Sequence, residues 1–204
     1  MSKNELGFIG IVFVSIALAG TLRIFSTPTT ESTINWVVER TITREEQFKI
    51  NWDSMSDEEK ALVQDQAMWM ARVLLSEDKR EEPWIMMASI IRNRELKRHR
   101  GKKTVWGVIH DEWQFSAVRT TKWRRYKNLN LESGNKKFNR AYQIALEVIV
   151  LGVPARYTGI THAYYPDTMT GAYGYSKGYP TWDTPNSPMD GRNEVDGWVY
   201  GIAP

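Results

Sequence analysis

The chain has 204 residues, of which 25% are charged, and a formal net charge of +3, which fits one soluble domain of ordinary size. It contains no cysteine, which excludes a disulfide framework, a thiolate metal site and a thiolate nucleophile. Nine Trp and nine Tyr are many for this length, and such rings fill cores but also line sugar-binding and base-binding sites.

The first apolar run covers residues 6–22 and has seventeen residues without a charge. This length is near the lower limit for a membrane-spanning helix, and the run lacks the polar face that a soluble core helix would show. A cleaved signal peptide is the alternative, because Ala17 and Ala19 have the spacing of a cleavage site. We expect residues 1–24 to form an uncleaved N-terminal membrane anchor.

Residues 25–55 are expected to form a tether and an N-terminal arm. Residues 26–32 are rich in Ser and Thr and contain a Pro, which is typical of a flexible segment. Residues 34–42 are rich in Val, Ile, Thr and Trp, and they fit either a strand or an arm that packs on the following domain.

Helix signals begin at residue 56, and from there we expect a mainly α domain that covers residues 56–204. Ser56 and Glu59 have the spacing of a capping box, in which each side chain satisfies a backbone N–H of the other residue. Pro83 suits the first turn of a second helix, and Gly152 suits the end of the last one. The four expected helices span residues 56–78, 83–96, 104–110 and 137–151.

Two basic clusters lie between these helices, at residues 97–103 (KRHRGKK) and 122–127 (KWRRYK). A solvated surface is the ordinary explanation of such charge runs. Nucleic-acid binding is another explanation, because neighbouring rings can stack on bases. The small net charge and the apolar N-terminal run disfavour it, so we expect no nucleic-acid partner.

From Pro154 onward the composition changes to Gly, Tyr, Pro and Trp, and no helix or strand period survives. A long irregular aromatic segment in a compact domain is often a binding surface. It can also be a tail that wraps around a helical core and closes it. The two interpretations are compatible, and both stay open.

The acid near the end of the first expected helix falls on the apolar side of that helix. At about 100° per residue, Glu77 lies near the middle of an apolar stripe. The stripe comprises Leu62, Val63, Trp69, Met70, Val73 and Leu74. Burial of an acid without a partner is costly, so Glu77 either turns out to water, forms an ion pair, or is kept protonated by apolar surroundings. The last state is what a general acid needs.

Most other chemistries lack their sequence patterns. There is no phosphate-binding or dinucleotide-binding glycine pattern and no Gly-x-Ser-x-Gly elbow. The three histidines lack metal-ligand spacing, so we expect no metal and no cofactor. Carboxylates remain, and acid cleavage of a glycosidic bond needs one protonated carboxyl near the bridging oxygen. A hydrolase adds a second carboxylate, whereas a lytic transglycosylase needs only one, because the sugar's own hydroxymethyl group attacks.

Five short sequence motifs occur in order between residues 71 and 182. They are residues 71–77 (ARVLLSE), 91–94 (IRNR), 105–109 with 114–116 (VWGVI and QFS), 159–164 (GITHAY) and 178–182 (GYPTW). In this order they resemble the motifs ARVIYSE, VLNR, GVI with QFS, G-A-T-H-F-Y and G-x-P-x-W of the spore-cortex-lytic type of cell-wall hydrolase. Each block is short, and their joint order makes the resemblance specific.

The resemblance implies a lysozyme-like, mainly helical domain that cleaves the glycan strand of peptidoglycan, as a lytic transglycosylase or a hydrolase. It implies that Glu77 is the catalytic acid and then the base. It implies that Asn93 holds the helix beside Glu77 through hydrogen bonds, while His162 fits a structural role equally well. The implied substrate contacts, along one groove, are Gln114, Phe115, Ser116, Thr161, His162, Tyr164 and Trp182.

The chain departs from the family beside Glu77. The family usually continues with Ala-Arg-Gly-Glu, whereas residues 78–81 are Asp-Lys-Arg-Glu, so Arg80 stands at the glycine position. The connection to the second helix is also about two residues short, which affects the shape of the groove. A non-catalytic module that binds cell wall is therefore the alternative function.

For the enzyme, the implied partners are the peptidoglycan strand and, through residues 1–24, a membrane. We expect the catalytic domain on the extracytoplasmic side, in the periplasm or at the cell wall. A compact chain with such an anchor would suit the lysis or cell-penetration protein of a bacteriophage.

Overall fold

The computed structural model describes residues 42–203 except 112–113, 167–179, 181–182 and 184–187. The expected membrane anchor, the tether and most of the expected arm lie outside the described residues. The chain divides into two units after Arg40, and all described residues belong to the second unit, Thr41–Pro204. Within the described part of the chain, no helix is long and apolar enough to cross a membrane.

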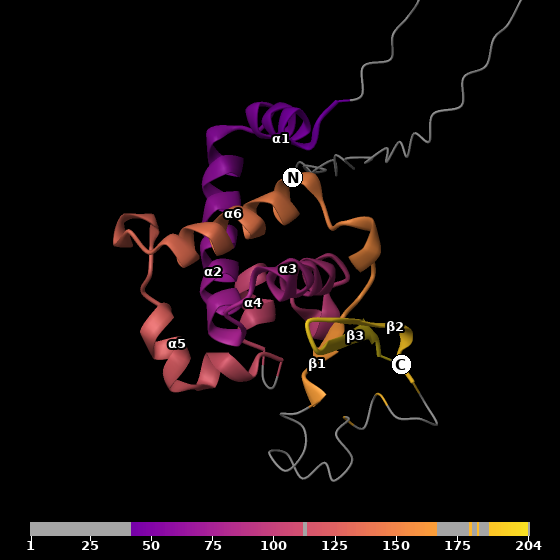
Figure 1. Ribbon diagram of the computed structural model, residues 1–204. Coiled ribbons are helices and arrows are strands. Elements are labelled where there is room, and N and C mark those ends of the chain that lie inside the picture. Colours follow the sequence, from indigo (N-terminus) through magenta and orange to yellow (C-terminus); the bar gives the residue numbers. More distant parts are fainter. Residues whose placement is uncertain (1–41, 112–113, 167–179, 181–182, 184–187, 204) are drawn as a thin grey trace, which may run out of the picture. The chain divides into compact units, whose positions relative to one another are not determined.

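The described residues are mainly helical, as the sequence predicts, with six α-helices and one small sheet (Figure 1). The helices are α1 (Arg44–Asp53), α2 (Asp57–Glu77), α3 (Glu81–Leu96), α4 (Val105–Ile109), α5 (Thr121–Tyr126) and α6 (Lys136–Leu151). The 3-10 turns are η1 (His99–Gly101), η2 (Ser116–Arg119), η3 (Leu131–Ser133) and η4 (Ala155–Tyr157). The four expected helices correspond to α2, α3, α4 and α6, and their ends lie within two residues of those expected.

Local capping explains where the long helices begin and end. The capping box before α2 is confirmed, because Ser56 accepts a hydrogen bond from the N–H of Glu59 and the Glu59 side chain accepts one from the N–H of Ser56. A second capping box, between Thr43 and Glu46, starts α1. Gly152 ends α6 with a φ of +85°, which a residue without a side chain adopts without strain.

Helix α1 falls within residues 25–55, which the sequence assigned to a tether and an arm. It packs on α6 through an ion pair of 3.2 Å between Arg44 and Glu147. The side-chain amide of Asn51 also donates a hydrogen bond of 3.0 Å to the carbonyl of Val150. These contacts join the start of the described chain to the helix that crosses α2.

The prediction that no strand follows Pro154 is wrong. Strands β1 (His162–Tyr164), β2 (Asp190–Val195) and β3 (Trp198–Ile202) form an antiparallel sheet in the order β1-β3-β2. Asp196 and Gly197, which join β2 to β3, both have positive φ values, as the tight turns that favour hairpins require. The central strand β3 therefore pairs on both sides, with a hairpin neighbour and with a strand far earlier in the chain.

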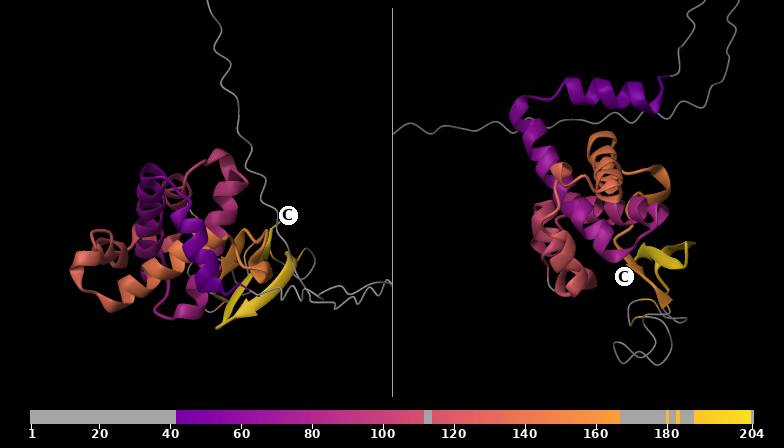
Figure 2. Two further views of the ribbon diagram at one scale, coloured as in Figure 1. Left: turned by 90° about the horizontal axis from the view of Figure 1, so that it is seen from above. Right: turned by 60° about the vertical axis from the view of Figure 1, so that its left-hand side comes forward.

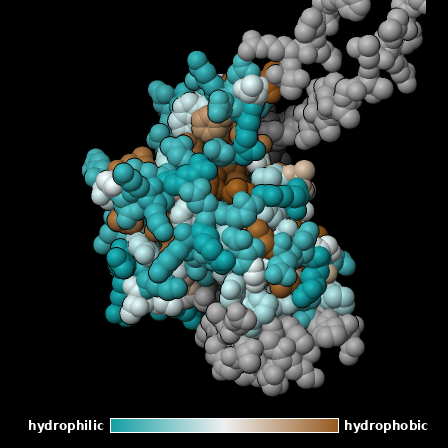
Figure 3. Space-filling model, viewed as in Figure 1, coloured by the Kyte–Doolittle hydropathy of each residue, from teal (hydrophilic) through white to brown (hydrophobic). Residues whose placement is uncertain are grey.

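The core lies among α2, α3 and α6, and its largest fully buried residues come from these helices and their neighbours. Of the stripe expected on α2, Met70, Val73 and Leu74 are fully buried. Leu62 is 58% exposed, contrary to the prediction, because the buried part of α2 begins only at Ala67. On the face shown in Figure 3, hydrophilic residues dominate and apolar residues appear in small patches.

The C-terminal end of α2 lies between two smaller parts of the fold. In both views of Figure 2, as in Figure 1, α5 lies on one side of this end and the three-stranded sheet lies on the other. Glu77 is the last residue of α2. The fold therefore places the candidate acid at a junction rather than along the surface of a continuous helix.

Candidate active site

Glu77 is half-buried, and the turn of α2 before it is buried at Leu74 and Leu75. Its Oε1 atom accepts a hydrogen bond of 2.9 Å from the backbone N–H of Ala117, which lies in η2. A backbone donor has no rotational freedom of its own, so this bond restricts the position of the carboxyl group.

Glu77 lines a hollow with a volume of about 180 Å³. The other lining residues are Leu75, Ser76, Asp78, Lys79, Lys122, Arg125 and Tyr126. One state considered from the sequence has Glu77 in purely apolar surroundings. The structure differs, because three cationic residues line the same hollow as Glu77. Glu77 therefore lies at the edge of a hollow whose lining includes three cationic residues.

Asp78 also lines the hollow, and its carboxylate is held by several donors. Its Oδ2 atom accepts hydrogen bonds from the guanidinium of Arg80 at 2.7 Å and from the indole N–H of Trp198 at 2.9 Å. Its Oδ1 atom accepts bonds from the backbone N–H groups of Lys79 and Arg80. Burial alone would raise the pKa of Asp78, but these hydrogen bonds outweigh burial and keep the pKa well below its usual value.

Arg80, at the position where the family has glycine, closes the short connection between α2 and α3. Its φ is −102°, a value open to any residue, so the backbone here does not require glycine. Its guanidinium instead binds the carboxylate of Asp78. The indole N–H of Trp84 donates a bond of 3.0 Å to the Asp78 carbonyl, so the turn of α3 that follows is also tied to the end of α2.

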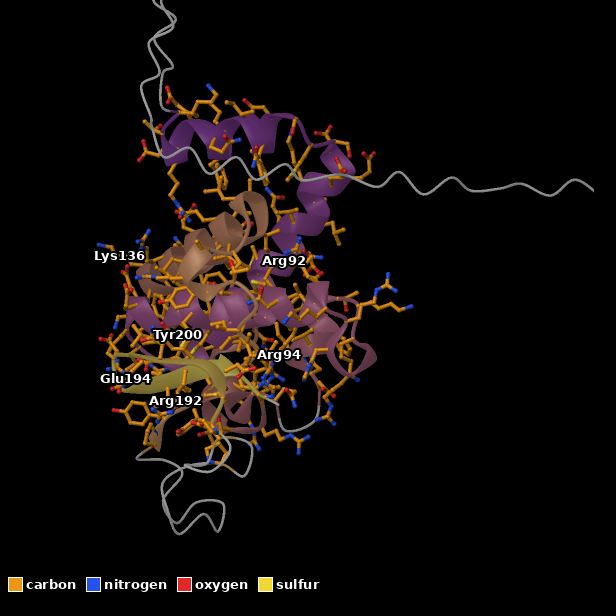
Figure 4. All side chains as sticks on the ribbon, turned by 90° about the vertical axis from the view of Figure 1, so that its right-hand side faces the viewer. Arg92, Arg94, Lys136, Arg192, Glu194 and Tyr200 are labelled. Carbon is orange, nitrogen blue, oxygen red and sulfur yellow. The ribbon has the colours of Figure 1, made fainter. Side chains whose placement is uncertain are left out.

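The structure joins two of the predicted substrate-binding segments through Arg94, which the sequence analysis did not single out. The guanidinium of Arg94 lies over the ring of Phe115, 5.4 Å from its centre. Its Nε atom donates a hydrogen bond of 2.6 Å to the carbonyl of Thr161. Figure 4 shows Arg94 beside the sheet that carries Tyr200. Since Phe115 is two residues before Ala117, this group of contacts adjoins the one around Glu77.

His162 is half-buried beside this arginine. Its Nδ1 atom lies 2.9 Å from Oγ1 of Thr161, and its ring meets the ring of His99 edge-on at 5.6 Å. Burial, with the nearby charge of Arg94, lowers the pKa of His162 to about 4. The imidazole is therefore neutral at pH 7 and acts as a hydrogen-bonding group rather than as a cation.

Tyr164 is buried, with 2% of its surface exposed, and its hydroxyl donates a bond of 2.7 Å to Oδ2 of Asp183. Asp183 also accepts bonds from the backbone N–H of Met189 and from Nε of Arg192. Burial alone would raise the pKa of Asp183, but these bonds keep it below its usual value. Tyr164 thus holds Asp183, and its ring is buried rather than open to a ligand.

The predicted site residues that remain are Asn93, Gln114, Ser116 and Trp182. The side-chain amide of Asn93 donates bonds of 2.8 Å to the carbonyls of Tyr157 and Ile160, so it positions the segment before β1 rather than Glu77 directly. Gln114 is a half-buried turn residue and Ser116 begins η2. Trp182 lies outside the described residues.

Glu77 thus offers a carboxyl group held by a backbone donor, beside a hollow that is also lined by cations. Within the described part of the chain, no three His, Asp or Glu side chains are grouped so that they could hold a metal ion. In comparisons with known proteins, no family model, no curated protein and no solved structure matches the chain.

Proposed function

We propose that this chain cleaves the glycan strands of bacterial peptidoglycan with Glu77 as the general acid and then the base, in a lysozyme-like domain. The observation that carries the proposal is that Glu77, whose carboxyl accepts a hydrogen bond from the N–H of Ala117, lines an open hollow at the end of α2. A positioned carboxyl within reach of a bound ligand is the first requirement of general acid catalysis.

In the proposed reaction, Glu77 gives its proton to the bridging oxygen as the bond between that oxygen and C1 breaks. The departing sugar leaves with a free hydroxyl group. The 6-hydroxyl oxygen of the remaining sugar then attacks C1 while the Glu77 carboxylate takes the hydroxyl proton. A 1,6-anhydro ring forms, and Glu77 is protonated again for the next cycle.

The state of Asp78 favours transglycosylation over hydrolysis. A hydrolase needs a second carboxylate that activates water or attacks the sugar. Asp78 lines the same hollow, but its oxygens already accept hydrogen bonds from Arg80, Trp198 and two backbone N–H groups. A carboxylate with its lone pairs used in this way is a poor base, so we assign the whole proton cycle to Glu77.

The apolar run of residues 6–22 supports a further part of the proposal, delivery of the domain to the extracytoplasmic side by a membrane anchor. A lytic enzyme must reach the cell wall, and an anchor would hold it there. Lysis or cell penetration by a bacteriophage is the setting that we propose for such a chain.

Product analysis tests the proposed reaction. Purified sacculi are digested with the full chain, and the released fragments are analysed by mass spectrometry. We expect fragments with 1,6-anhydro ends, which are lighter by one water than hydrolysis products. Reducing ends would show hydrolysis and overturn the transglycosylase assignment, and absence of any release would overturn the enzymatic proposal.

A non-catalytic module that binds cell wall is the second candidate, and a group of aromatic rings favours it. Trp106 is 53% exposed and stacks on His110 at 4.3 Å, and His110 meets Trp123 edge-on. Exposed rings of this kind can stack on sugars. Binding of the chain to sacculi without release of fragments, and loss of binding in Trp106→Ala, would support this candidate.

A further inference from the structure

The structure divides the second basic cluster, residues 122–127, into two sets of side chains. Lys122 and Arg125, three residues apart on α5, line the hollow that contains Glu77. Arg124 and Lys127 belong to the same cluster and are not among the residues that line this hollow. All four side chains are exposed. The charge run is therefore more than a uniformly solvated surface, because part of it faces the candidate active site.

The orientation of α5 is fixed by the residue between these cations. Trp123 is partly buried against the core, and its ring stacks on Trp69 of α2 with centres 6.3 Å apart. Residues three apart on a helix share a face. Packing of Trp123 on α2 therefore directs Lys122 and Arg125 to a common side, where the hollow lies.

The charges in the hollow are not balanced within the described part of the protein. The carboxylate of Asp78 is paired with Arg80 at 2.7 Å. No ion pair within 4.0 Å joins a described carboxylate to the side chains of Lys79, Lys122 or Arg125. Three cations of the hollow thus have no ion-pair partner among the described carboxylates, and a bound ligand with negative groups would gain from all three.

We propose that the hollow selects glycan strands whose sugars carry carboxylates, with Lys122 and Arg125 as specificity-determining residues. This inference rests on the proposed function of Glu77. In peptidoglycan, alternate sugars carry a lactyl group that is extended by a short peptide, and the peptide carries free carboxylates. Arginine binds a carboxylate through two parallel hydrogen bonds, and lysine adds a point charge. A strand bound in this way would present its glycosidic bond to Glu77.

A matched pair of double variants tests this proposal. Lys122→Gln/Arg125→Gln removes the two cations that line the hollow, and Arg124→Gln/Lys127→Gln removes two cations of the same cluster that do not. Both reduce the formal net charge from +3 to +1. Each variant and the parent are given sacculi free of phosphate-containing polymers, before and after chemical amidation of the peptide carboxylates. The measured quantity is the amount of sacculi that gives half-maximal release of fragments.

We expect Lys122→Gln/Arg125→Gln to raise this amount about threefold to tenfold on untreated sacculi, as two exposed ion pairs would. The maximal rate of Lys122→Gln/Arg125→Gln should stay close to that of the parent. For Arg124→Gln/Lys127→Gln, both the maximal rate and the half-maximal amount of sacculi should stay close to the parent values. Amidation of the sacculi should raise the half-maximal amount for the parent by the same factor. It should raise the half-maximal amount for Lys122→Gln/Arg125→Gln little further. Equal losses in the two double variants would show a general effect of net charge and overturn the proposal, as would unchanged cleavage of amidated sacculi.

Failure of the proposed function would look different, because the parent would then release nothing from either substrate. In that case, sedimentation of each variant with the two kinds of sacculi still tests the selection of carboxylates. Weaker binding of Lys122→Gln/Arg125→Gln alone would support it, and equal binding of all variants would overturn it.

Discussion

The backbone N–H of Ala117 donates a hydrogen bond of 2.9 Å to the carboxyl of Glu77, and so joins the end of α2 to η2. Two residues before Ala117, the ring of Phe115 lies beneath Arg94, which in turn binds the carbonyl of Thr161. Three segments that are distant in the sequence therefore meet through a short series of contacts. Each contact has a consequence that substitution can measure.

Asp78→Asn should destabilise the protein at neutral pH by about 1–3 kcal/mol, because an amide cannot form the ion pair with Arg80 and leaves its donors poorly matched. The folded state lowers the pKa of Asp78, so its contribution is present above the unfolded pKa of about 4 and is lost as the pH falls below it. Chemical denaturation from pH 7 to pH 3 should show the difference from the parent shrinking. Asp53→Asn, at an exposed position, is the control for loss of one charge. A difference that is independent of pH would contradict this account.

Arg94→Gln should lower the free energy of unfolding by about 3 kcal/mol, since it removes a buried cation that binds Thr161 and packs on Phe115. Among the described residues, the Nη1 atom of Arg94 has no hydrogen-bond partner, so its stabilising contacts there are these two and the nearby charge of Asp111. Arg92→Gln, two residues away on α3, is the matched control. Arg92 pairs with Glu95 closer to the surface, so Arg92→Gln should lower the free energy of unfolding by less than about 1 kcal/mol. Equal losses in urea denaturation would show that burial of Arg94 has no special role.

His162→Gln should make stability less sensitive to mild acid. The pKa of His162 is about 4 in the folded protein, whereas an unfolded histidine titrates near 6.5, so only the unfolded state gains a proton between these values. The stability of the parent should therefore be full above pH 6.5 and fall as the pH decreases toward 4. After a discount for partial exposure of the ring, the loss at pH 5 is about 1 kcal/mol. Thermal melts at pH 7 and pH 5 measure it, and the same decrease in both proteins would refute a buried neutral imidazole.

The helices that the sequence predicts are those with local signals. Helices α2 and α6 combine an apolar stripe with a capping residue or a terminal glycine, and these features act within one turn. Helix α1 has a capping box at Thr43 but no buried residue, so the apolar period that reveals a helix is missing. Helix α5 has six residues, of which three are cations around one tryptophan, and such a short charged run is typical of a loop.

The strands and the site contacts depend on residues that are far apart in the chain. The Asp-Gly turn and the following run WVYGI are a hairpin signal in the sequence, but the glycine-rich and tyrosine-rich segment before them obscures it. The pairing of β1 with β3 joins residues 162–164 to residues 199–201, a separation that no local period reveals.

In the candidate site, too, the sequence reveals local features but not contacts between residues that are far apart in the chain. Glu77 is marked by its place on an apolar stripe, which is a local feature. Its donor is the backbone of Ala117, and a backbone N–H has no sequence signature. Arg94 and Asp183 likewise act on partners that are 67 and 19 residues away. The sequence can therefore indicate which acid to examine, while the groups that position it become visible only in the fold.

In the proposed glycan cleavage Glu77 alone carries the proton, and one substitution at this residue is the sharpest test of that role. Release of soluble fragments from purified sacculi is measured for the parent, Glu77→Gln and Glu82→Gln, with circular dichroism to establish that all three are folded. Glu82 is an acid on the next helix whose side chain is 46% exposed and pairs with Arg156, so it controls for loss of one negative charge. We predict that Glu77→Gln lowers the rate at least about 100-fold, as loss of a general acid does, while Glu82→Gln stays near the parent. A folded Glu77→Gln that digests sacculi at the rate of the parent would contradict the account.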